Sequence, residues 1–110
     1  MSGRSRIETF KRDNLLVDMI FQHKGKENAI GTKELVLALS ERGYKMKADR
    51  LHTVIKKITF ERHIPICSVG HSGYYWATSK QDIQLAVADL QEKIIGLQER
   101  IDLLKSFIYE

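Results

Sequence analysis

Residues that could bind a metal ion or act as a nucleophile gather in one short stretch, at His63, Cys67 and His71. Zinc ligands must converge on one ion in tetrahedral geometry. Four-residue steps along an extended segment separate successive side chains by about 13 Å, so these three residues predict no metal site. Cys67 is better explained as a small buried hydrophobe.

Catalytic chemistry has little support elsewhere in the chain. A Cys–His pair would need an orienting third group and a cleft, and a core of this size leaves little room for one. The sequence holds no glycine-rich phosphate loop and no HExxH motif. We therefore expect no enzyme activity, no cofactor and no small-molecule ligand.

Lys and Arg residues are unevenly distributed along the chain, and this distribution indicates what kind of partner it binds. Residues 1 to 78 hold 14 Lys or Arg against 8 Asp or Glu, whereas residues 79 to 110 hold 4 against 6. A basic domain of this kind favours a polyanion such as DNA as partner. The alternative is that the surplus lysines only keep a small domain soluble.

The segment from Lys47 to Arg62 places part of this charge on one helix face. Its apolar residues recur at helical spacing and form one stripe: Leu51, Val54, Ile55 and Ile58. At 100° per residue the opposite face carries Asp49, Thr53 and Lys56, flanked by Arg50, His52 and Lys57. This exposed face is mostly cationic and hydrogen-bonding.

Two more helices and a hairpin are predicted around this segment. "RDNLLVDMIFQHKG" (12–25) reads as an amphipathic helix ending near Gly25, "AIG" (29–31) suits a brief strand, and Thr32 stands as N-cap of a helix that ends near Gly43. "IPICSVGHSGYYWATS" (64–79) reads as a β-hairpin whose turn has positive φ at Gly70 and Gly73. Pairing with "AIG" would complete a three-stranded sheet against the helices.

Residues 10–79 resemble winged helix-turn-helix DNA-binding domains, most closely those of small phage and prophage proteins with an Ile-Pro-Ile-Cys-Ser strand, a Gly turn and a Gly-Tyr-Tyr strand. The resemblance implies an α+β, mostly α fold: three helices, a small antiparallel β-sheet with a wing, then a long C-terminal helix. Such proteins often carry acidic residues after the second strand. This chain has Lys80-Gln81-Asp82 there, which predicts a less well capped last helix.

In this fold the third helix enters the major groove, where a bidentate Arg or Lys distinguishes guanine by about 1 to 3 kcal/mol. The resemblance implies base or phosphate contacts on that helix by Lys47, Arg50, Thr53, Lys56 and Lys57. It implies a phosphate contact at the start of the second helix, by Thr32 and Lys33. Further contacts are expected from the wing tip, His71 and Ser72, and from Arg4 and Arg6 in a flexible basic arm over residues 1–9.

Residues 80–110 carry the clearest periodicity and predict an amphipathic coiled-coil helix. Apolar residues alternate four and three apart: Ile83, Val87, Leu90, Ile94, Leu97, Ile101, Leu104 and Ile108. β-branched residues at a and mostly Leu at d favour a parallel two-stranded homodimer. Arg100 would then face Lys105, a like-charge contact, and Gly96 weakens the helix by about 1 kcal/mol. An antiparallel pair, a larger bundle and docking on the chain's own domain stay open.

Together these features predict a sequence-specific double-stranded DNA-binding protein, a phage or prophage transcription regulator that self-associates through its C-terminal helix. A single cysteine excludes an internal disulfide and favours a reducing cytoplasm. The longest aliphatic run, residues 35–39, predicts neither a signal peptide nor a membrane span. Two alternatives are a phage replication-initiation or replisome-organising protein and a winged-helix protein-interaction module, such as a phage-encoded inhibitor.

Overall fold

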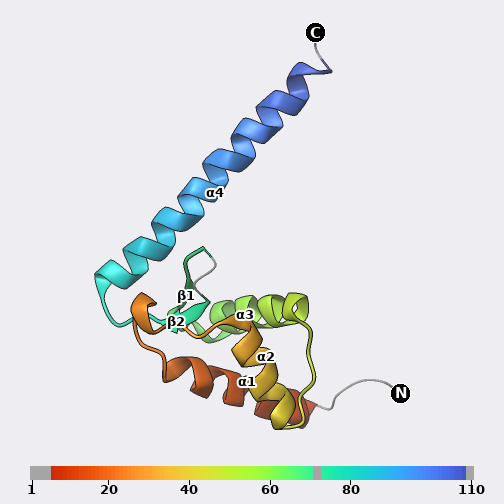
Figure 1. Cartoon of the computed structure of the whole chain (residues 1–110), viewed down its shortest axis with the longest axis vertical. Coiled ribbons are helices and arrows are strands. Elements are labelled where there is room, and N and C mark those ends of the chain that lie inside the picture. The colour runs from red at the N-terminus through yellow and green to blue at the C-terminus, as the bar shows by residue number, and fades with distance from the viewer. Residues whose placement is uncertain (1–5, 71–72, 109–110) are drawn as a thin grey trace.

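The fold is taken from a computed structural model, which describes residues 6–70 and 73–108 (Figure 1). Its elements run in the order α1 (Arg6–Phe21), the 3₁₀ turn η1 (Lys26–Asn28), α2 (Thr32–Glu41), α3 (Ala48–Arg62), β1 (Ile66–Ser68), β2 (Tyr74–Trp76) and α4 (Lys80–Ser106). The predicted α+β, mostly α class is confirmed. No helix in the described ranges is long and apolar enough to cross a membrane.

Helix α1 begins earlier than the apolar pattern predicted. It starts at Arg6, so Arg6 to Thr9 are helical, although residues 1–9 were expected to form a flexible arm. The turns that follow contact α3. The Arg62 guanidinium donates to Asn14 Oδ1 at 2.8 Å and lies 5.4 Å from the centre of the Phe10 ring. Because these contacts join residues far apart in the sequence, hydrophobic periodicity does not reveal them.

Helix α2 starts and stops at glycines. Its N-cap is Gly31, and within the described part of the chain no side chain caps it, so the prediction that Thr32 is the N-cap was wrong. Thr32 is the first helical residue. The predicted stop is confirmed: Gly43 has φ 89°, its N–H donates to Ser40 O at 3.0 Å, and Tyr44 N–H donates to Leu39 O at 2.9 Å. This pair of bonds is a Schellman motif, which satisfies the last carbonyls of the helix.

The hairpin is antiparallel, with Ile66 opposite Trp76 and Cys67 opposite Tyr75. The predicted positive φ values are confirmed, at 56° for Gly70 and 94° for Gly73. The predicted three-stranded sheet was wrong: among the described residues the sheet has two strands, and "AIG" contributes one bridge, from Ile30 to Tyr74. The turn η1 ends at residue 28 and α2 begins at residue 32, which leaves too little extended chain for a strand.

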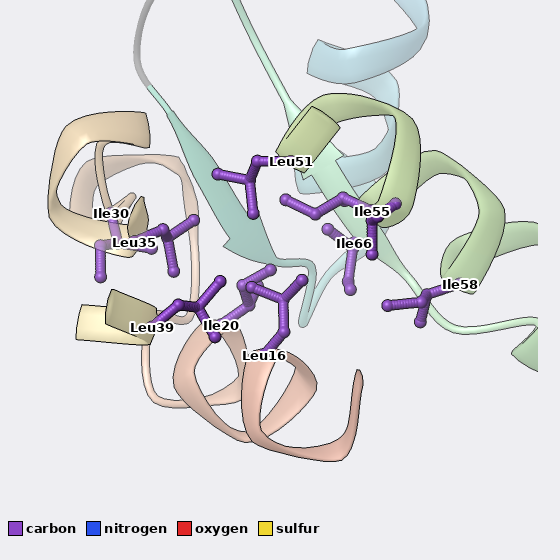
Figure 2. Close-up of a cluster of buried hydrophobic side chains, with 10 residues drawn as sticks. Leu16, Ile20, Ile30, Leu35, Leu39, Leu51, Ile55, Ile58 and Ile66 are labelled. Atoms are coloured by element: carbon purple, nitrogen blue, oxygen red, sulfur yellow. The ribbon is translucent and has the colours of Figure 1, made fainter. Parts of the chain in front are cut away.

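The core lies where α1, α2, α3 and the hairpin meet (Figure 2). Its buried side chains are Leu16, Ile20, Ile30, Leu35, Leu39, Leu51, Val54, Ile55, Ile58 and Ile66. The stripe predicted on α3 is therefore confirmed as its buried face. From β2, Tyr75 is fully buried, whereas its neighbours Tyr74 and Trp76 lie on the opposite face of the strand and stay partly exposed.

Helix α4 leaves this domain and extends well beyond it (Figure 1). Its start is firmly capped: the Asp82 amide donates to Ser79 Oγ at 3.1 Å, and the Asp82 carboxylate accepts from the Thr78 amide at 2.9 Å. The buried Tyr75 hydroxyl donates to the carbonyl of Asp82 at 3.0 Å. The prediction of a poorly capped last helix was wrong, because Ser79 and Asp82 supply the side chains that a helix start needs.

Candidate nucleic-acid interface

The outer face of α3 presents the residues predicted to contact DNA. Arg50, Thr53, Lys56 and Lys57 are all exposed, and Lys47 is the exposed N-cap of the helix. The Thr53 hydroxyl donates to the carbonyl of Asp49 at 3.2 Å, one turn back on its own helix. Lys57 Nζ lies 3.9 Å from Glu61, a surface pair that contributes at most about 1 kcal/mol. The cations of this face are therefore available to a partner.

Arg6 lies close to the cationic residues on the outer face of α3. A groove of about 700 Å³ between α1 and α3 is lined by Arg6, Arg50, Thr53, Lys57 and Arg62, among others. Asp13 and Glu61 supply negative charge in the same groove. The sequence placed Arg6 in an arm reaching the minor groove, whereas it stands at the start of α1, beside the cations of α3.

The remaining predicted contacts divide between α2 and residues outside the described ranges. Thr32 and Lys33 are the first two residues of α2, where backbone N–H groups face outward, and Lys33 is exposed. Glu34 follows in the same turn and places a negative charge near that end. Arg4, His71 and Ser72 lie outside the residues that the structure describes.

Two residues of the site were not singled out from the sequence as a pair. His52 on the flank of α3 forms a hydrogen bond through Nδ1 with the Tyr74 hydroxyl of β2, and their ring centres are 5.6 Å apart. This contact joins the helix to the hairpin. The period-two alternation of the strand places Tyr74 on the face opposite the buried Tyr75, but it does not identify His52 as the partner.

Phe60 also belongs to the outer face of α3, with 78 % of its side chain exposed. It lies two turns after Thr53, close to the middle of the face opposite the core. A phenyl ring in this position adds an apolar contact point among cationic side chains.

The cysteine region has the properties of a packed strand. Burial raises the pKa of the Cys67 thiol, and the nearby Asp82 carboxylate raises it further, so the thiol stays protonated at neutral pH. Burial also raises the pKa of Tyr75 to about 12, with Cys67 and Asp82 adding to the effect. Over residues 6–70 and 73–108 no three His, Cys, Asp or Glu side chains cluster as metal ligands.

Helix α4 exposes the predicted stripe. Between 45 % and 71 % of each side chain is accessible at Val87, Leu90, Ile94, Leu97, Ile101, Leu104 and Ile108. Ile83 is 39 % exposed, and Ala86 is buried against the domain. A stripe this long on a helix that leaves its domain is typical of an interaction surface.

No family model matches the chain, and no curated protein or solved structure matches it.

Beside α4, a second groove opens toward α3. It has a volume of about 600 Å³, and it is lined from α3 by His52, Ile55, Lys56, Thr59 and Phe60, from the hairpin by Ile66, Cys67, Ser68 and Tyr74, and from α4 by Ile83, Ala86, Val87, Leu90 and Lys93. Its walls are mainly apolar. The first turns of the α4 stripe therefore face their own domain across an open groove.

Proposed function

We propose that this protein binds double-stranded DNA through the outer face of α3, as a winged helix-turn-helix protein that pairs through α4. The observation that carries the proposal is the exposure of Arg50, Thr53, Lys56 and Lys57 on the face opposite the buried stripe. The order of three helices and a hairpin supports it. In this proposal the protein is a non-catalytic phage or prophage transcription regulator of the cytoplasm.

The proposed binding mode follows from the size of the elements. The major groove of B-DNA is about 12 Å wide and admits one α-helix. Arg50 has the geometry to read a guanine edge, and Lys56 and Lys57 would contact phosphates or bases. The hairpin, joined to α3 through His52 and Tyr74, would lie beside the helix as the wing.

The test is a double substitution, Lys56→Ala with Lys57→Ala, in the full chain. Neither side chain belongs to the core, so the fold should stay intact. The plot of log affinity against log salt should become shallower by about 1 for each DNA phosphate that the variant no longer neutralises. Gel-shift or fluorescence-anisotropy titrations at four salt concentrations, with circular dichroism as a check of folding, measure this.

A matched control removes two exposed lysines from the segment after α1, by Lys24→Ala with Lys26→Ala. This variant removes the same formal charge from a position outside α2 and α3. Its slope of log affinity against log salt should differ from that of the unaltered protein by less than about 1. Equal slopes in the two variants would show that net charge, and not the α3 face, carries the binding.

A protein-interaction module is the second candidate, favoured by the exposed Phe60 on the same face. Aromatic residues are enriched at protein interfaces, whereas phosphate contacts need none. Selection of bound fragments from random duplex DNA separates the two functions. Enrichment of a defined sequence supports the DNA-binding proposal, and no enrichment at any salt concentration supports the interaction module.

A further inference from the structure

Over the first turns of α4, the apolar stripe faces the domain formed by α1, α2, α3 and the hairpin. Ile83, Val87 and Leu90 belong to the stripe and also line the groove that α3 and the hairpin close from the other side. In Figure 1 the hairpin lies between the start of α4 and α3. Any helix that pairs with the full stripe must therefore enter this groove.

A parallel pair fits this requirement less well than an antiparallel one. In a parallel two-stranded coiled coil each residue meets its own copy across the two-fold axis. Val87 would meet the partner's Val87, and each chain carries α3 and the hairpin on that same side of the helix. Both copies of the domain would then lie at the same end of the pair, facing each other beside the two-fold axis.

An antiparallel pair places the two domains at opposite ends and uses the whole stripe. When the midpoint lies between residues 95 and 96, four pairings each occur twice: Ile83 with Ile108, Val87 with Leu104, Leu90 with Ile101, and Ile94 with Leu97 of the partner. Every a residue then meets a d residue. The same arrangement places the partner's Phe107 beside Ala86. The Phe107 ring is 69 % exposed in the single chain, and the small side chain of Ala86 leaves room for it.

Charge does not favour either direction, because each creates one repeated like-charge contact. The parallel pair brings Arg100 to Lys105, and the antiparallel pair brings Lys93 to Arg100 of the partner. In the antiparallel arrangement Gln91 faces Gln98 of the partner, a neutral pair that can hydrogen-bond. The position of the domain beside the first turns of α4 is therefore the observation that favours the antiparallel direction.

The groove would enlarge the contact of an antiparallel pair. Seating the end of the partner helix there adds Phe60, Ile66 and Tyr74 to the apolar surface that the stripe itself supplies.

We propose that α4 pairs antiparallel with α4 of a second copy of this chain, and that the end of the partner helix fills the groove between α3, the hairpin and α4. This deepens the proposed self-association and rests on it. The occupant of the groove is the partner's segment from Ile101 to Ile108. In this symmetric pair, the end of each α4 fills the groove of the other chain.

Disulfide trapping tests the direction. In a Cys67→Ser background, one chain carries Leu90→Cys and a size-tagged chain carries Ile101→Cys, and the two are mixed and oxidised. An antiparallel pair forms disulfides only between the two different chains, because those positions share a layer. A parallel pair forms them only between identical chains, which would overturn the proposal. A dimer that forms neither product would also overturn it.

Substitution of Phe60 tests the groove itself. Phe60→Ala should leave the isolated domain folded, because the ring is largely exposed, and should raise the dimer dissociation constant by about tenfold. The matched control is Leu37→Ala, which removes an exposed apolar side chain of α2 away from the groove. It should change that constant by less than roughly twofold. Equal effects of the two variants would exclude the groove from the interface.

The two proposals fail in different ways. Sedimentation of the unaltered protein as a monomer across the micromolar range would contradict self-association through α4, and with it the antiparallel pair. A stable dimer with trapping between identical chains would contradict only the direction and the occupied groove. DNA binding through α3 is tested by the salt titration, with sedimentation of the Lys56→Ala, Lys57→Ala variant as a check, because Lys56 also lines the groove.

Discussion

Gly73 lies where the hairpin approaches the segment before α2 most closely. Its φ is 94°, and a Cβ built there would lie 2.1 Å from the carbonyl oxygen of Ile30. On either side of this contact the backbones of Ile30 and Tyr74 exchange two hydrogen bonds of 2.8 Å. A side chain at residue 73 would have to break this bridge as well as adopt an unfavourable backbone conformation.

We expect Gly73→Ala to lower the free energy of unfolding by about 3 kcal/mol or more, from backbone strain and the clash with Ile30 together. The control is Gly70→Ala, at the other end of the turn. It has φ 56°, and among the described residues no atom lies within 4 Å of its added Cβ, so its cost should be about 1 kcal/mol. Urea denaturation of both variants measures the difference, and equal midpoints would contradict the prediction.

The buried Tyr75 makes the free energy of unfolding depend on pH in the alkaline range. Its pKa of about 12 lies above the ordinary value of 10.0, so the folded state retains a proton that the unfolded state releases. The resulting stability is complete below pH 10 and is lost as the pH rises toward 12. Two pKa units correspond to about 3 kcal/mol.

Tyr75→Phe should lower stability by about 1 kcal/mol at pH 7, because the hydrogen bond from the Tyr75 hydroxyl to the carbonyl of Asp82 is lost. Between pH 10 and 12 its stability should fall less steeply than that of the unaltered protein. Burial also raises the pKa of Tyr74, so a smaller decline should persist. Denaturant midpoints at four pH values check this, and parallel pH profiles would show that Tyr75 does not set the slope.

The sequence predicted features that depend on neighbouring residues, and it did not predict contacts between residues far apart in the chain. The stripe of α3 and the turn glycines follow from local periodicity and local backbone conformation, and both were confirmed. The pair His52–Tyr74 and the contact Arg62–Asn14 join residues 22 and 48 positions apart. No local pattern encodes such a contact, so neither the early start of α1 nor the link from α3 to the hairpin could be predicted.

At the scale of elements, α4 differs from the other helices in how it is held. The helices α1, α2 and α3 bury leucine and isoleucine in a common core, whereas α4 buries Ala86 and is anchored mainly by the hydrogen bonds of its first turn. Its heptad spacing was evident in the sequence. The groove beside its first turns was not, because that groove depends on where the hairpin sets the helix.

We expect Leu97→Asp to convert the protein to a monomer without unfolding the domain. Leu97 is exposed and belongs to the middle layer of the stripe, so in a pair the new carboxylate would be buried without a partner, at a cost of several kcal/mol. Sedimentation velocity and circular dichroism measure association and folding. Loss of the folded domain would instead indicate that α4 packs on its own chain.

The matched substitution is Leu103→Asp, at a residue that is equally exposed but lies outside the a and d positions. In a two-stranded pair it should leave the dimer intact. If it also yields a monomer, the apolar surface used is wider than one stripe, as in a bundle of more helices.

At the scale of the whole molecule, the chain has principal extents of 54 × 41 × 24 Å, and α4 accounts for its elongation (Figure 1). The domain at one end carries the candidate DNA face, and the helix carries the candidate pairing face. An antiparallel pair would hold two α3 helices apart by a distance that the length of α4 sets. The free energy of binding two DNA half-sites would then depend on this spacing.

Because α4 is fixed at Ser79 and runs without interruption to Ser106, it transmits helical phase as well as length. Repeating residues 87–93 after Lys93 would keep the phase of the stripe and lengthen the helix by about 10.5 Å. We expect a stable dimer that loses affinity for two-site DNA selected by the unaltered protein, while binding to single sites is unchanged.

Inserting one alanine after Lys93 would turn the distal stripe by about 100° and abolish pairing itself. Sedimentation and gel shifts on both DNAs measure these outcomes, and equal behaviour of the two insertions would mean that α4 does not couple the domains rigidly.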